Sequence, residues 1–472
     1  MSNFDRSYIQ KLVSDAIKEL ESKNIISSNF VTSNGVFENV DDAVYSSRIA
    51  QKIWVKVSTD IKKKIISELR KTMHKYAEDF SKKAHFETGM GRVEDKIAKH
   101  HNAADATPGM EDLETRSWTG SKGTVIEERA PYGVIAGITP STHPIPVLLN
   151  SIIISIAGGN SIVFSVHPSA KNVSAYAIQI FHKVIVENGG PENLISMIKE
   201  PTLENVNKLF NHNDIDLIVA TGGPAVVEAA FKAGKKVIAA GPGNPPVLVD
   251  QTADLDVAAK SIITGASFDN NILCIAEKET FVVSQVFEEF KQAMTKNGAV
   301  CLNQEQIELL TKKAIMKNDK GHYFGTRGFI GKNANVLASA CGLNLSHNVR
   351  LLFGEVSEHH PFVVAEQMMP FIPIVKVNSF EEGIMKCKKA EHGFGHTAVI
   401  HSNNLQNITK FTQEMDTSIV IVNGPSIAGN GPNAGEGYFS HTIASPTGEG
   451  VCTPRDFTRV RRIAISNALK IV

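Results

Sequence analysis

The chain has 472 residues, of which 42% are hydrophobic and 21% are charged, values that are ordinary for a soluble globular protein. This length can enclose several hydrophobic cores, so we expect two or three domains. The 49 Lys and Arg residues balance the 49 Asp and Glu residues, and no overall charge therefore favours nucleic acid or an acidic membrane surface as a partner.

Residues 1–20 form a separate segment in which apolar side chains recur at helical spacing, while acidic and basic side chains cover the other face. A Ser- and Asn-rich stretch over residues 21–35 follows and is typical of a linker. A tethered amphipathic helix can dock on its own domain, bind a membrane surface or bind a partner's groove. Its few basic residues are mixed with acids, which disfavours the membrane, and the pattern alone favours docking on its own domain.

The pattern is helical from Asp41 to about Ala104, and strand and helix signals then alternate. The predicted strands are 132–140, 160–166, 194–200, 215–223 and 235–241, and the predicted helices are 143–159, 169–190 and 224–234. This repetition specifies a parallel sheet with right-handed crossovers, which is a doubly wound α/β domain. A second α/β pattern begins near Gly243, with a helix at 254–266 and a strand at 278–283.

Ligands of doubly wound sheets bind beyond the carboxyl ends of the strands, so the loops 139–144, 166–170 and 221–225 should line a site. The Thr-Gly-Gly-Pro sequence at 221–224 places backbone N–H groups at the start of a helix, which suits a phosphate. The chain has no GxGxxG, P-loop, HExxH or GxSxG motif. The usual dinucleotide fingerprint is therefore missing, although the architecture suits a dinucleotide.

The five cysteines are odd in number, widely spaced and free of any CxxC pair: Cys274, Cys301, Cys341, Cys387 and Cys452. This pattern argues against a disulfide framework or a zinc site, and for a reducing compartment. The longest apolar stretch, PVLLNSIIISIAGG, is too short to cross a bilayer and is interrupted by polar residues.

One cysteine, Cys274, lies between a polar Asp-Asn-Asn sequence at 269–271 and a strand-like run. A buried structural thiol normally lies within an apolar run. Asp and Asn favour turns because their side chains bond to nearby backbone, so the position indicates a thiol presented on a loop. On this stretch alone, a packed structural cysteine is the commoner alternative.

Six stretches occur along the chain in a distinctive order: TPSTHP, AAGPGNPP, SFDNNILC, EQMMPFIPIV, HGFGHTAVI and SPTGEG. With this order and spacing the chain resembles the aldehyde dehydrogenase superfamily, in particular its CoA-acylating branch, and it looks most like the propionaldehyde dehydrogenases of bacterial microcompartments. The resemblance covers essentially the whole chain. It implies an α/β fold with a doubly wound cofactor domain, an α/β catalytic domain, and a small hairpin and strand used for oligomerisation.

The resemblance implies that Cys274 is the nucleophile, whose thiolate attacks an aldehyde carbonyl to give a thiohemiacetal and, after hydride transfer to NAD⁺, a thioester. The backbone N–H of Cys274 and a polar group on the loop 139–144 would hold the oxyanion. Thr142 aligns with the family's polar donor. His143, where acylating relatives often have Asn, is either a second candidate or a packed residue.

The hydrolytic branch of the family carries a glutamate upstream of the cysteine that activates water. This chain has Ala239 and Ala240 at the matching position. Without a base to activate water, a thioester can persist until a thiol such as coenzyme A accepts the acyl group. This departure agrees with acylation rather than acid formation.

The same matching implies a set of cofactor residues. Glu366 would hold the hydroxyls of the nicotinamide ribose, and Ile427 and Pro140 would line the aldehyde and nicotinamide channels. The loop around the adenosine ribose carries no cation to meet a 2′-phosphate, which favours NAD⁺ over NADP⁺. The implied cofactor contacts are Thr139, Pro140, Ser165, His167, Pro168, Thr221, Gly222, Gly223 and Glu366. The other four cysteines would be structural, and no metal is expected.

In microcompartment aldehyde dehydrogenases a short amphipathic helix directs the enzyme into a protein shell, so the resemblance favours encapsulation by residues 1–20 over self-docking. We therefore expect a homo-oligomer in the cytoplasm, inside the lumen of a bacterial microcompartment. The implied domains are an encapsulation helix 1–20, a linker 21–35, an NAD-binding domain 36–238 interrupted by an oligomerisation hairpin at about 117–131, a catalytic domain 239–440, and a return segment with an oligomerisation strand 441–472.

Three functions follow from these features. The first is the NAD-dependent, CoA-acylating oxidation of a short-chain aldehyde, propionaldehyde or acetaldehyde. The second is a hydrolytic or phosphorylating aldehyde dehydrogenase. The third is a catalytically silent cargo protein of the shell, against which the intact Cys274 and Glu366 argue.

Overall fold

The computed structural model describes residues 34–431 and 435–471, which divide into two compact units. The described part of the first unit comprises residues 34–87, 99–240 and 438–471, and that of the second comprises 88–98, 241–431 and 435–437. The predicted helix 1–20, and the predicted linker 21–35 apart from its last two residues, lie outside the described residues. Each unit is built around its own parallel sheet.

The first unit contains a six-stranded sheet in which all neighbouring strands are parallel. The strands follow the order β1 (Val36–Phe37), β6 (Ile195–Ile198), β5 (Ser161–Val166), β4 (Val134–Thr139), β7 (Leu217–Thr221) and β8 (Lys236–Ala240). Seven helices accompany them: α2 (Val40–Trp54), α3 (Thr59–Thr88), α4 (Val93–Ala106), α5 (Pro144–Ala157), α6 (Lys171–Glu187), α7 (Leu203–Asn211) and α8 (Pro224–Lys232). The boundary between the units falls within α4, after Ala98.

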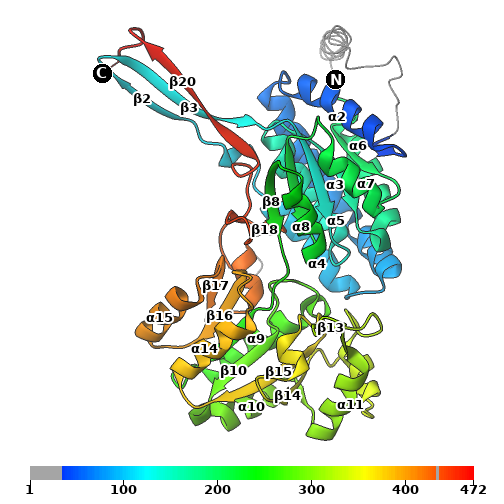
Figure 1. Ribbon diagram of the computed structural model, residues 1–472, viewed down its shortest axis with the longest axis vertical. Helices are drawn as coiled ribbons and strands as arrows, with labels where there is room; N and C mark the ends of the chain where they lie inside the picture. Colours follow the sequence, from blue (N-terminus) through cyan, green and yellow to red (C-terminus); the bar gives the residue numbers. More distant parts are fainter. Residues whose placement is uncertain (1–33, 432–434, 472) are drawn as a thin grey trace. The chain divides into compact units, whose positions relative to one another are not determined.

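Both faces of the six-stranded sheet are buried, because its strands alternate their side chains between two separate cores. In β4, Ile135 belongs to the core that contains α3, α5 and α6, whereas Val134 and Ala136 belong to the core that contains α7 and α8. Figure 1 shows these helices around the sheet. This arrangement confirms the predicted doubly wound α/β fold.

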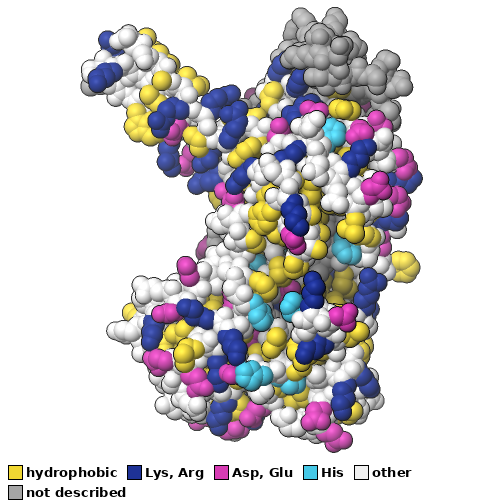
Figure 2. Space-filling view, viewed as in Figure 1, with side chains coloured by type: hydrophobic (Ala, Val, Ile, Leu, Met, Phe, Trp, Pro, Cys, Tyr) yellow, Lys and Arg dark blue, Asp and Glu magenta, His cyan; other side chains and the backbone are white. Residues whose placement is uncertain are grey.

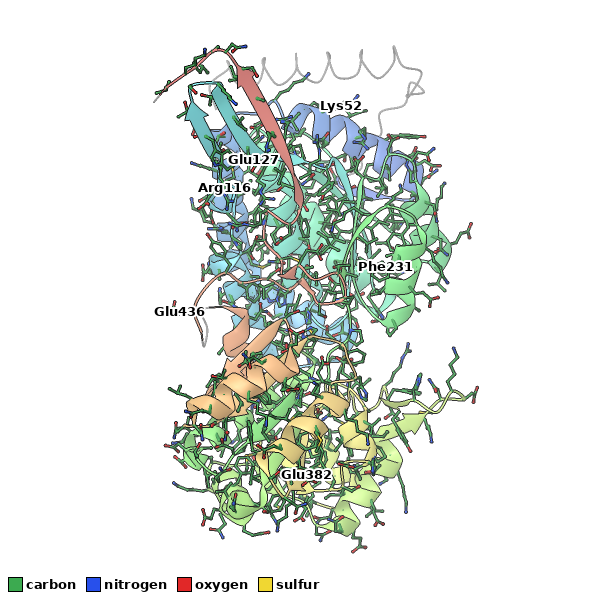
Figure 3. The ribbon with its side chains drawn as sticks, turned by 60° about the vertical axis from the view of Figure 1, so that its left-hand side comes forward. Lys52, Arg116, Glu127, Phe231, Glu382 and Glu436 are labelled. Carbon is green, nitrogen blue, oxygen red and sulfur yellow. The ribbon has the colours of Figure 1, made fainter. Side chains whose placement is uncertain are left out.

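The first unit also carries an antiparallel three-stranded sheet, formed by β2 (Arg116–Gly120), β3 (Gly123–Pro131) and the late strand β20 (Thr458–Ser466). It stands apart from the helices of its unit as a long twisted ribbon (Figure 1), and Lys and Arg side chains gather along it (Figure 2). Arg116 and Glu127, which face each other across β2 and β3, are labelled in Figure 3. The predicted hairpin and the predicted C-terminal strand thus form one sheet. A short antiparallel pair, β18 (Ile443–Ala444) and β19 (Gly450–Val451), completes the unit.

The second unit contains a seven-stranded parallel sheet. Its order is β11 (Val300–Cys301), β14 (Leu352–Glu355), β15 (Phe371–Val377), β10 (Glu279–Val283), β9 (Pro246–Val249), β16 (Thr397–His401) and β17 (Ile419–Val422). Its helices are α9 (Leu255–Ser267), α10 (Phe287–Lys296), α11 (Gln304–Ala314), α12 (Ala334–Ala340), α13 (Pro361–Val364), α14 (Phe380–Ala390) and α15 (Leu405–Met415). A hairpin of β12 (Ile315–Lys317) and β13 (Tyr323–Gly325) lies between α11 and α12 in the chain. In the described parts of both units, no helix combines the length and the apolar character needed to cross a membrane.

Candidate active site

Cys274 follows a turn of unusual backbone conformation. After α9 ends at Ser267, three successive residues have positive φ angles, 46° at Asp269, 56° at Asn270 and 66° at Asn271. Asp and Asn enter this left-handed region more readily than other non-glycine residues. The Asp-Asn-Asn sequence therefore folds as the predicted turn, and Cys274 lies on a second turn just beyond it.

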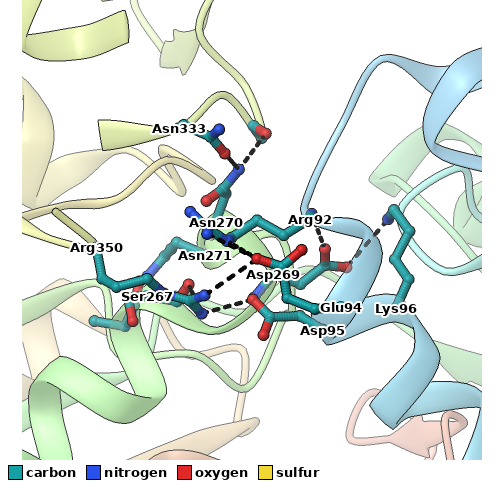
Figure 4. Close-up of polar contacts among 12 residues, drawn as sticks. Arg92, Glu94, Asp95, Lys96, Ser267, Asp269, Asn270, Asn271, Asn333 and Arg350 are labelled. Atoms are coloured by element: carbon teal, nitrogen blue, oxygen red, sulfur yellow. Dashed lines mark hydrogen bonds and ion pairs between the residues drawn. The ribbon is translucent and has the colours of Figure 1, made fainter. Parts of the chain in front are cut away.

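Buried polar contacts hold the first residue of this turn (Figure 4). The carboxylate of Asp269 accepts hydrogen bonds from the backbone N–H of Arg92 at 2.7 Å and from Lys96 Nζ at 3.1 Å. The backbone N–H of Asp269 donates to Asp95 Oδ2 at 2.9 Å, and Arg350 Nη2 lies 2.6 Å from the same oxygen. The Asp269 and Lys96 side chains are almost completely buried, which strengthens the attraction between their charges.

The two asparagines fix the rest of the turn. Asn270 Nδ2 donates to the carbonyl of Gly331 and to Asn333 Oδ1, both at 2.8 Å. Asn271 Nδ2 donates to the carbonyl of Glu277, also at 2.8 Å, which closes the loop that carries Cys274. A loop with buried, paired polar groups is rigid, and rigidity is what a positioned nucleophile needs.

The Cys274 side chain is only partly buried, which confirms that the thiol is presented on a loop. Burial and the negative charge of Glu366 raise the pKa of the Cys274 thiol to about 12. The positive charge of Lys278 and the backbone N–H groups of Cys274 and Ile275 act in the opposite direction. The reactivity of this thiol therefore depends on the few groups that stabilise its anion.

The other cysteines do not share this setting. Cys341, Cys387 and Cys452 are buried, and burial raises the pKa of each thiol. Cys301, which was also predicted to be structural, differs from them because it lies exposed on β11. The strand β11 has only two residues and forms the edge of its sheet, which leaves the side chain uncovered.

Glu366 and Cys274 both belong to the second unit and interact electrostatically. Glu366 is partly buried, and the backbone N–H of Gly243 lies 3.5 Å from its Oε1. Burial raises the pKa of the Glu366 carboxyl to about 7, while Lys278 and the Gly243 N–H oppose the shift. A Cβ atom at Gly243 would lie 2.5 Å from the Cys274 carbonyl oxygen, so only glycine allows this approach.

Four segments that meet here lead into the amino ends of neighbouring strands: Gly243 precedes β9, Lys278 precedes β10, Glu366 precedes β15, and His396 precedes β16. The His396 ring is buried, and burial together with the charge of Lys278 lowers its pKa to about 4. These residues of the second unit thus gather at the amino edge of its sheet.

Two buried charged residues, Glu277 and Lys278, were not among the predicted site residues. Glu277 accepts hydrogen bonds from the Ser426 N–H at 2.7 Å and from Ser426 Oγ at 2.6 Å. It thereby joins the cysteine loop to the segment Ser426–Asn430, which carries the partly exposed Ile427. The available signal was the run Glu-Lys-Glu at 277–279, which leads into the buried strand β10. Charged residues are almost never fully buried unless they are paired, so three of them at the start of a buried strand indicate that they have partners.

In the first unit, the predicted site residues lie at and just beyond the carboxyl ends of β4, β5 and β7. Thr139 faces Val166 at the ends of β4 and β5, and Thr221 faces Ala240 at the ends of β7 and β8. The chain moves from β4 to β5 and β6 on one side, and then crosses to β7 and β8 on the other. The strand order therefore reverses between β4 and β7, which is where doubly wound sheets bind ligands.

Three hydroxyl groups at these strand ends fit a nucleotide cofactor. The side-chain oxygens of Thr139, Ser165 and Thr221 are buried and have no hydrogen-bond partner among the described residues. Buried hydroxyls are normally paired, so unpaired ones at a ligand edge are suited to a bound polar group. The backbone at Gly222 and Gly223 leads into α8, with Gly223 as its N-cap, and His167 and Pro168 are exposed beside the end of β5.

The loop after β4 carries the two oxyanion candidates. Thr142 is partly exposed, and its carbonyl oxygen lies 3.4 Å from Lys99 Nζ. His143 is buried as the N-cap residue of α5, and its ring stacks on His441 with the centroids 4.7 Å apart. His143 therefore packs within the first unit, and Thr142 is the candidate that we retain.

Ala239 and Ala240 are buried at the end of β8, where the Ala239 N–H donates to Thr447 Oγ1. Of the predicted site residues, Cys274, Glu366 and Ile427 lie in the second unit, and the others lie in the first.

Within the described parts of the chain, no group of three His, Cys, Asp or Glu residues is arranged to hold a metal ion.

Comparisons with known proteins show the family of this chain. Residues 30–305 match the model of the aldehyde dehydrogenase family. The acetylating acetaldehyde dehydrogenase of Escherichia coli K12 is 44% identical over 467 residues, which cover 98% of this chain and 99% of that protein.

Two solved structures are similar over almost their whole length. The propionaldehyde dehydrogenase of Rhodopseudomonas palustris with bound propionyl-CoA has a TM-score of 0.90 and 38% identity, and the match covers 94% of this chain and 99% of that one. The propionaldehyde dehydrogenase of the Clostridium phytofermentans fucose utilisation microcompartment has a TM-score of 0.90 and 41% identity, with 93% and 100% covered.

Proposed function

Because the chain belongs to the aldehyde dehydrogenase family, we propose that it is a CoA-acylating aldehyde dehydrogenase, which oxidises a short-chain aldehyde to the acyl-CoA with NAD⁺ as the oxidant. The observation that carries this proposal is the position of Cys274, partly exposed on a loop whose preceding residues are held by buried polar contacts. A thiol so held is suited to covalent catalysis, whereas the packed thiols of Cys341, Cys387 and Cys452 are not.

The residues act in a defined sequence. The Cys274 thiolate adds to the aldehyde carbonyl carbon, and the carbonyl oxygen takes the negative charge. The backbone N–H of Cys274 and a polar group of the loop containing Thr142 would stabilise that charge. NAD⁺, when bound, supplies the hydride acceptor. Cys274 then carries the acyl group as a thioester, which coenzyme A releases by thiol exchange.

The chain offers no glutamate at the positions where the hydrolytic branch activates water, because Ala239 and Ala240 stand there. This supports transfer of the acyl group to a thiol over hydrolysis. The relatives named above are themselves acetylating or propionaldehyde dehydrogenases, and they favour neither a hydrolytic or phosphorylating enzyme nor a silent cargo protein.

Each unit, taken by itself, has residues that suit a nicotinamide cofactor. The unpaired hydroxyls of Thr139, Ser165 and Thr221 suit its polar groups, and Glu366 would hold the ribose hydroxyls. Lys171, the first cation after the loop 166–170, has its ammonium 2.8 Å and 2.9 Å from the two carboxylate oxygens of Glu200. A cation already paired with a carboxylate is poorly suited to a 2′-phosphate, which supports NAD⁺ over NADP⁺.

Purified protein tests the proposal directly. We expect NADH formation from propionaldehyde or acetaldehyde only when coenzyme A is present, with acyl-CoA as the product. Cys274→Ala should lower this rate by several orders of magnitude, because the obligatory nucleophile is lost, and Cys341→Ala should leave it within a few-fold. NADH formation of equal rate with water or phosphate as the only acceptor would contradict acylation. Turnover by Cys274→Ala would contradict the assigned nucleophile.

The proposed cellular setting is the lumen of a bacterial microcompartment, reached through the helix predicted at residues 1–20. One similar structure is of an enzyme from a fucose utilisation microcompartment, which supports this setting. We also propose that the protein is a homo-oligomer assembled through the three-stranded sheet. Trp118, Val460 and Ile463 are 50%, 55% and 41% exposed on that sheet, and such apolar exposure is typical of an interface.

A further inference from the structure

Lys278 is a fully buried lysine that follows the nucleophile by four positions. Its ammonium donates three hydrogen bonds: to the Asn271 carbonyl at 3.0 Å, to Asn271 Oδ1 at 2.7 Å and to the Leu273 carbonyl at 2.9 Å. An ammonium has three protons, and here all three are used. Every acceptor lies on the segment that leads directly into Cys274.

A buried ammonium is costly unless it is paired and hydrogen-bonded. Burial lowers the pKa of Lys278 to about 8, and the negative charges of Glu366, Cys274, Glu277 and Glu279 oppose that shift. Lys278 thus remains a cation near neutral pH and lies among these acidic groups. Its charge also lowers the pKa of Cys274.

The geometry points to Lys278 as the positioning residue of the nucleophile: its ammonium holds the backbone before Cys274 in place and stabilises the negative charge on the sulfur. This role rests on the proposed function, because it concerns the reactivity of Cys274 in that reaction. It is separable from the fold of the turn, since Asp269 and Asn270 have their own partners in Lys96, Arg92 and Asn333.

Several other titratable groups lie around Lys278. Glu277 and Glu279 flank it in the chain, and Glu366 and His396 come from the segments before β15 and β16. His396 is neutral above a pH of about 4. Glu366 and Glu277 have pKa values of about 7, and burial raises the pKa of Glu279 well above its ordinary value. The Lys278→Met variant keeps all three carboxyl groups, so a difference between its profile and that of the parent reports the charge of Lys278.

The test is the rate of Cys274 alkylation by iodoacetamide between pH 6.5 and 9.5, measured in a Cys301→Ser background to remove the exposed thiol. In Lys278→Met, Cys274 should be alkylated at least about tenfold more slowly at pH 7. An adjacent cation lowers a thiol pKa by about one unit or more, so its loss lowers the thiolate fraction by the same factor. In the parent protein the rise of the rate with pH should flatten above pH 8 as Lys278 loses its proton. In Lys278→Met the rise should continue, so that the two profiles converge at high pH.

Lys96→Met is the matched control, because Lys96 is also a buried lysine and binds the same turn through Asp269. It should lower the thermal midpoint without changing the shape of the alkylation profile. Lys278→Arg, whose guanidinium stays charged over this whole pH range, should keep the faster alkylation at pH 7 and show no flattening above pH 8. Lys278→Gln keeps an amide donor without the charge, and it provides the same test if the Met variant does not fold.

Equal alkylation profiles for folded Lys278→Met and its parent would overturn the inference, as would an equal change in Lys96→Met. Failure of both the Met and Gln variants to fold would also contradict it, since Lys278 would then serve the fold rather than the sulfur. Alkylation needs no aldehyde, NAD⁺ or coenzyme A. Failure of the proposed function would appear instead as a parent protein that lacks CoA-dependent NADH formation while its alkylation profile depends on Lys278.

Discussion

At the scale of single residues, the burial of Glu277 makes the stability of the fold depend on pH. Its carboxyl group is fully buried, and burial raises its pKa to about 7 against an ordinary value of 4.5. Between these two values the folded protein binds a proton that the unfolded chain has released. The stability that Glu277 contributes is therefore present below pH 4.5 and is lost as the pH rises through 7.

We predict that Glu277→Gln removes this dependence. Glutamine can still accept from the Ser426 N–H and carries no charge to bury, so the variant should gain up to about 3 kcal/mol relative to the parent at pH 8 and little at pH 5. Thermal unfolding midpoints at the two pH values check this. Glu289→Gln on the exposed face of α10 is the control and should change neither midpoint. A variant that is less stable than its parent at pH 8 would show that the charged form is favoured after all.

The residue scale also sets the limit of what the sequence predicts about the site. The Asp-Asn-Asn turn was predicted because those side chains favour turns wherever they occur, and the structure confirms it. Lys278 and Glu277 were missed because charged residues before a strand are usually solvated. Their partners explain the difference, since Ser426 lies 149 residues from Glu277 in the chain, and no local pattern records such a pairing.

At the scale of elements, the strands of the six-stranded sheet were the easiest to predict, whereas only β10 was predicted in the seven-stranded sheet. In β5 all six residues are buried, and such continuous apolar runs between turn signals are typical of parallel strands. The helix α7 was missed, because it is only nine residues long and buries only Leu209 and Phe210. It begins where the Thr202 side chain accepts from the Asn205 N–H, a capping signal that the sequence does contain.

The three-stranded sheet yields a prediction at the same scale. If it is the oligomer interface, Ile463→Glu should place a charge in an apolar contact and lower the mass observed by sedimentation velocity, because an unpaired buried charge is strongly unfavourable. Leu405→Glu is the matched control, since Leu405 is 74% exposed at the start of α15 and lies outside this sheet. An unchanged mass for folded Ile463→Glu would exclude this surface as the interface.

At the scale of the whole molecule, the proposed encapsulation helix can be separated from catalysis. Deleting residues 1–20 should change kcat and KM by less than about twofold, because the predicted catalytic and cofactor residues lie between Thr139 and Ile427 and the polar stretch after the helix is typical of a boundary. Steady-state assays with propionaldehyde, NAD⁺ and coenzyme A measure this.

The same segment fused to a fluorescent protein should enter shells when it is co-expressed with shell proteins, since an amphipathic helix this short orders fully only on a partner. Leu12→Glu and Ile17→Glu in the fusion should prevent entry by placing charge on the apolar stripe. If the fusion protein stays diffuse in the cell, or if it still enters shells when it carries both substitutions, the helix docks on its own domain instead.

The pairing of β20 with β3 has a consequence for how the protein is made. Arg461 on β20 contacts Glu128 on β3, although the two residues are 333 positions apart in the chain. On the ribosome, the hairpin of β2 and β3 emerges long before its third strand exists, so the free edge of β3 is exposed throughout synthesis of the second unit. A long unpaired edge can pair with another nascent chain. The charged ladder on this edge, which includes Glu127, Glu128 and Arg129, would therefore also protect the unfinished protein from aggregation while translation continues.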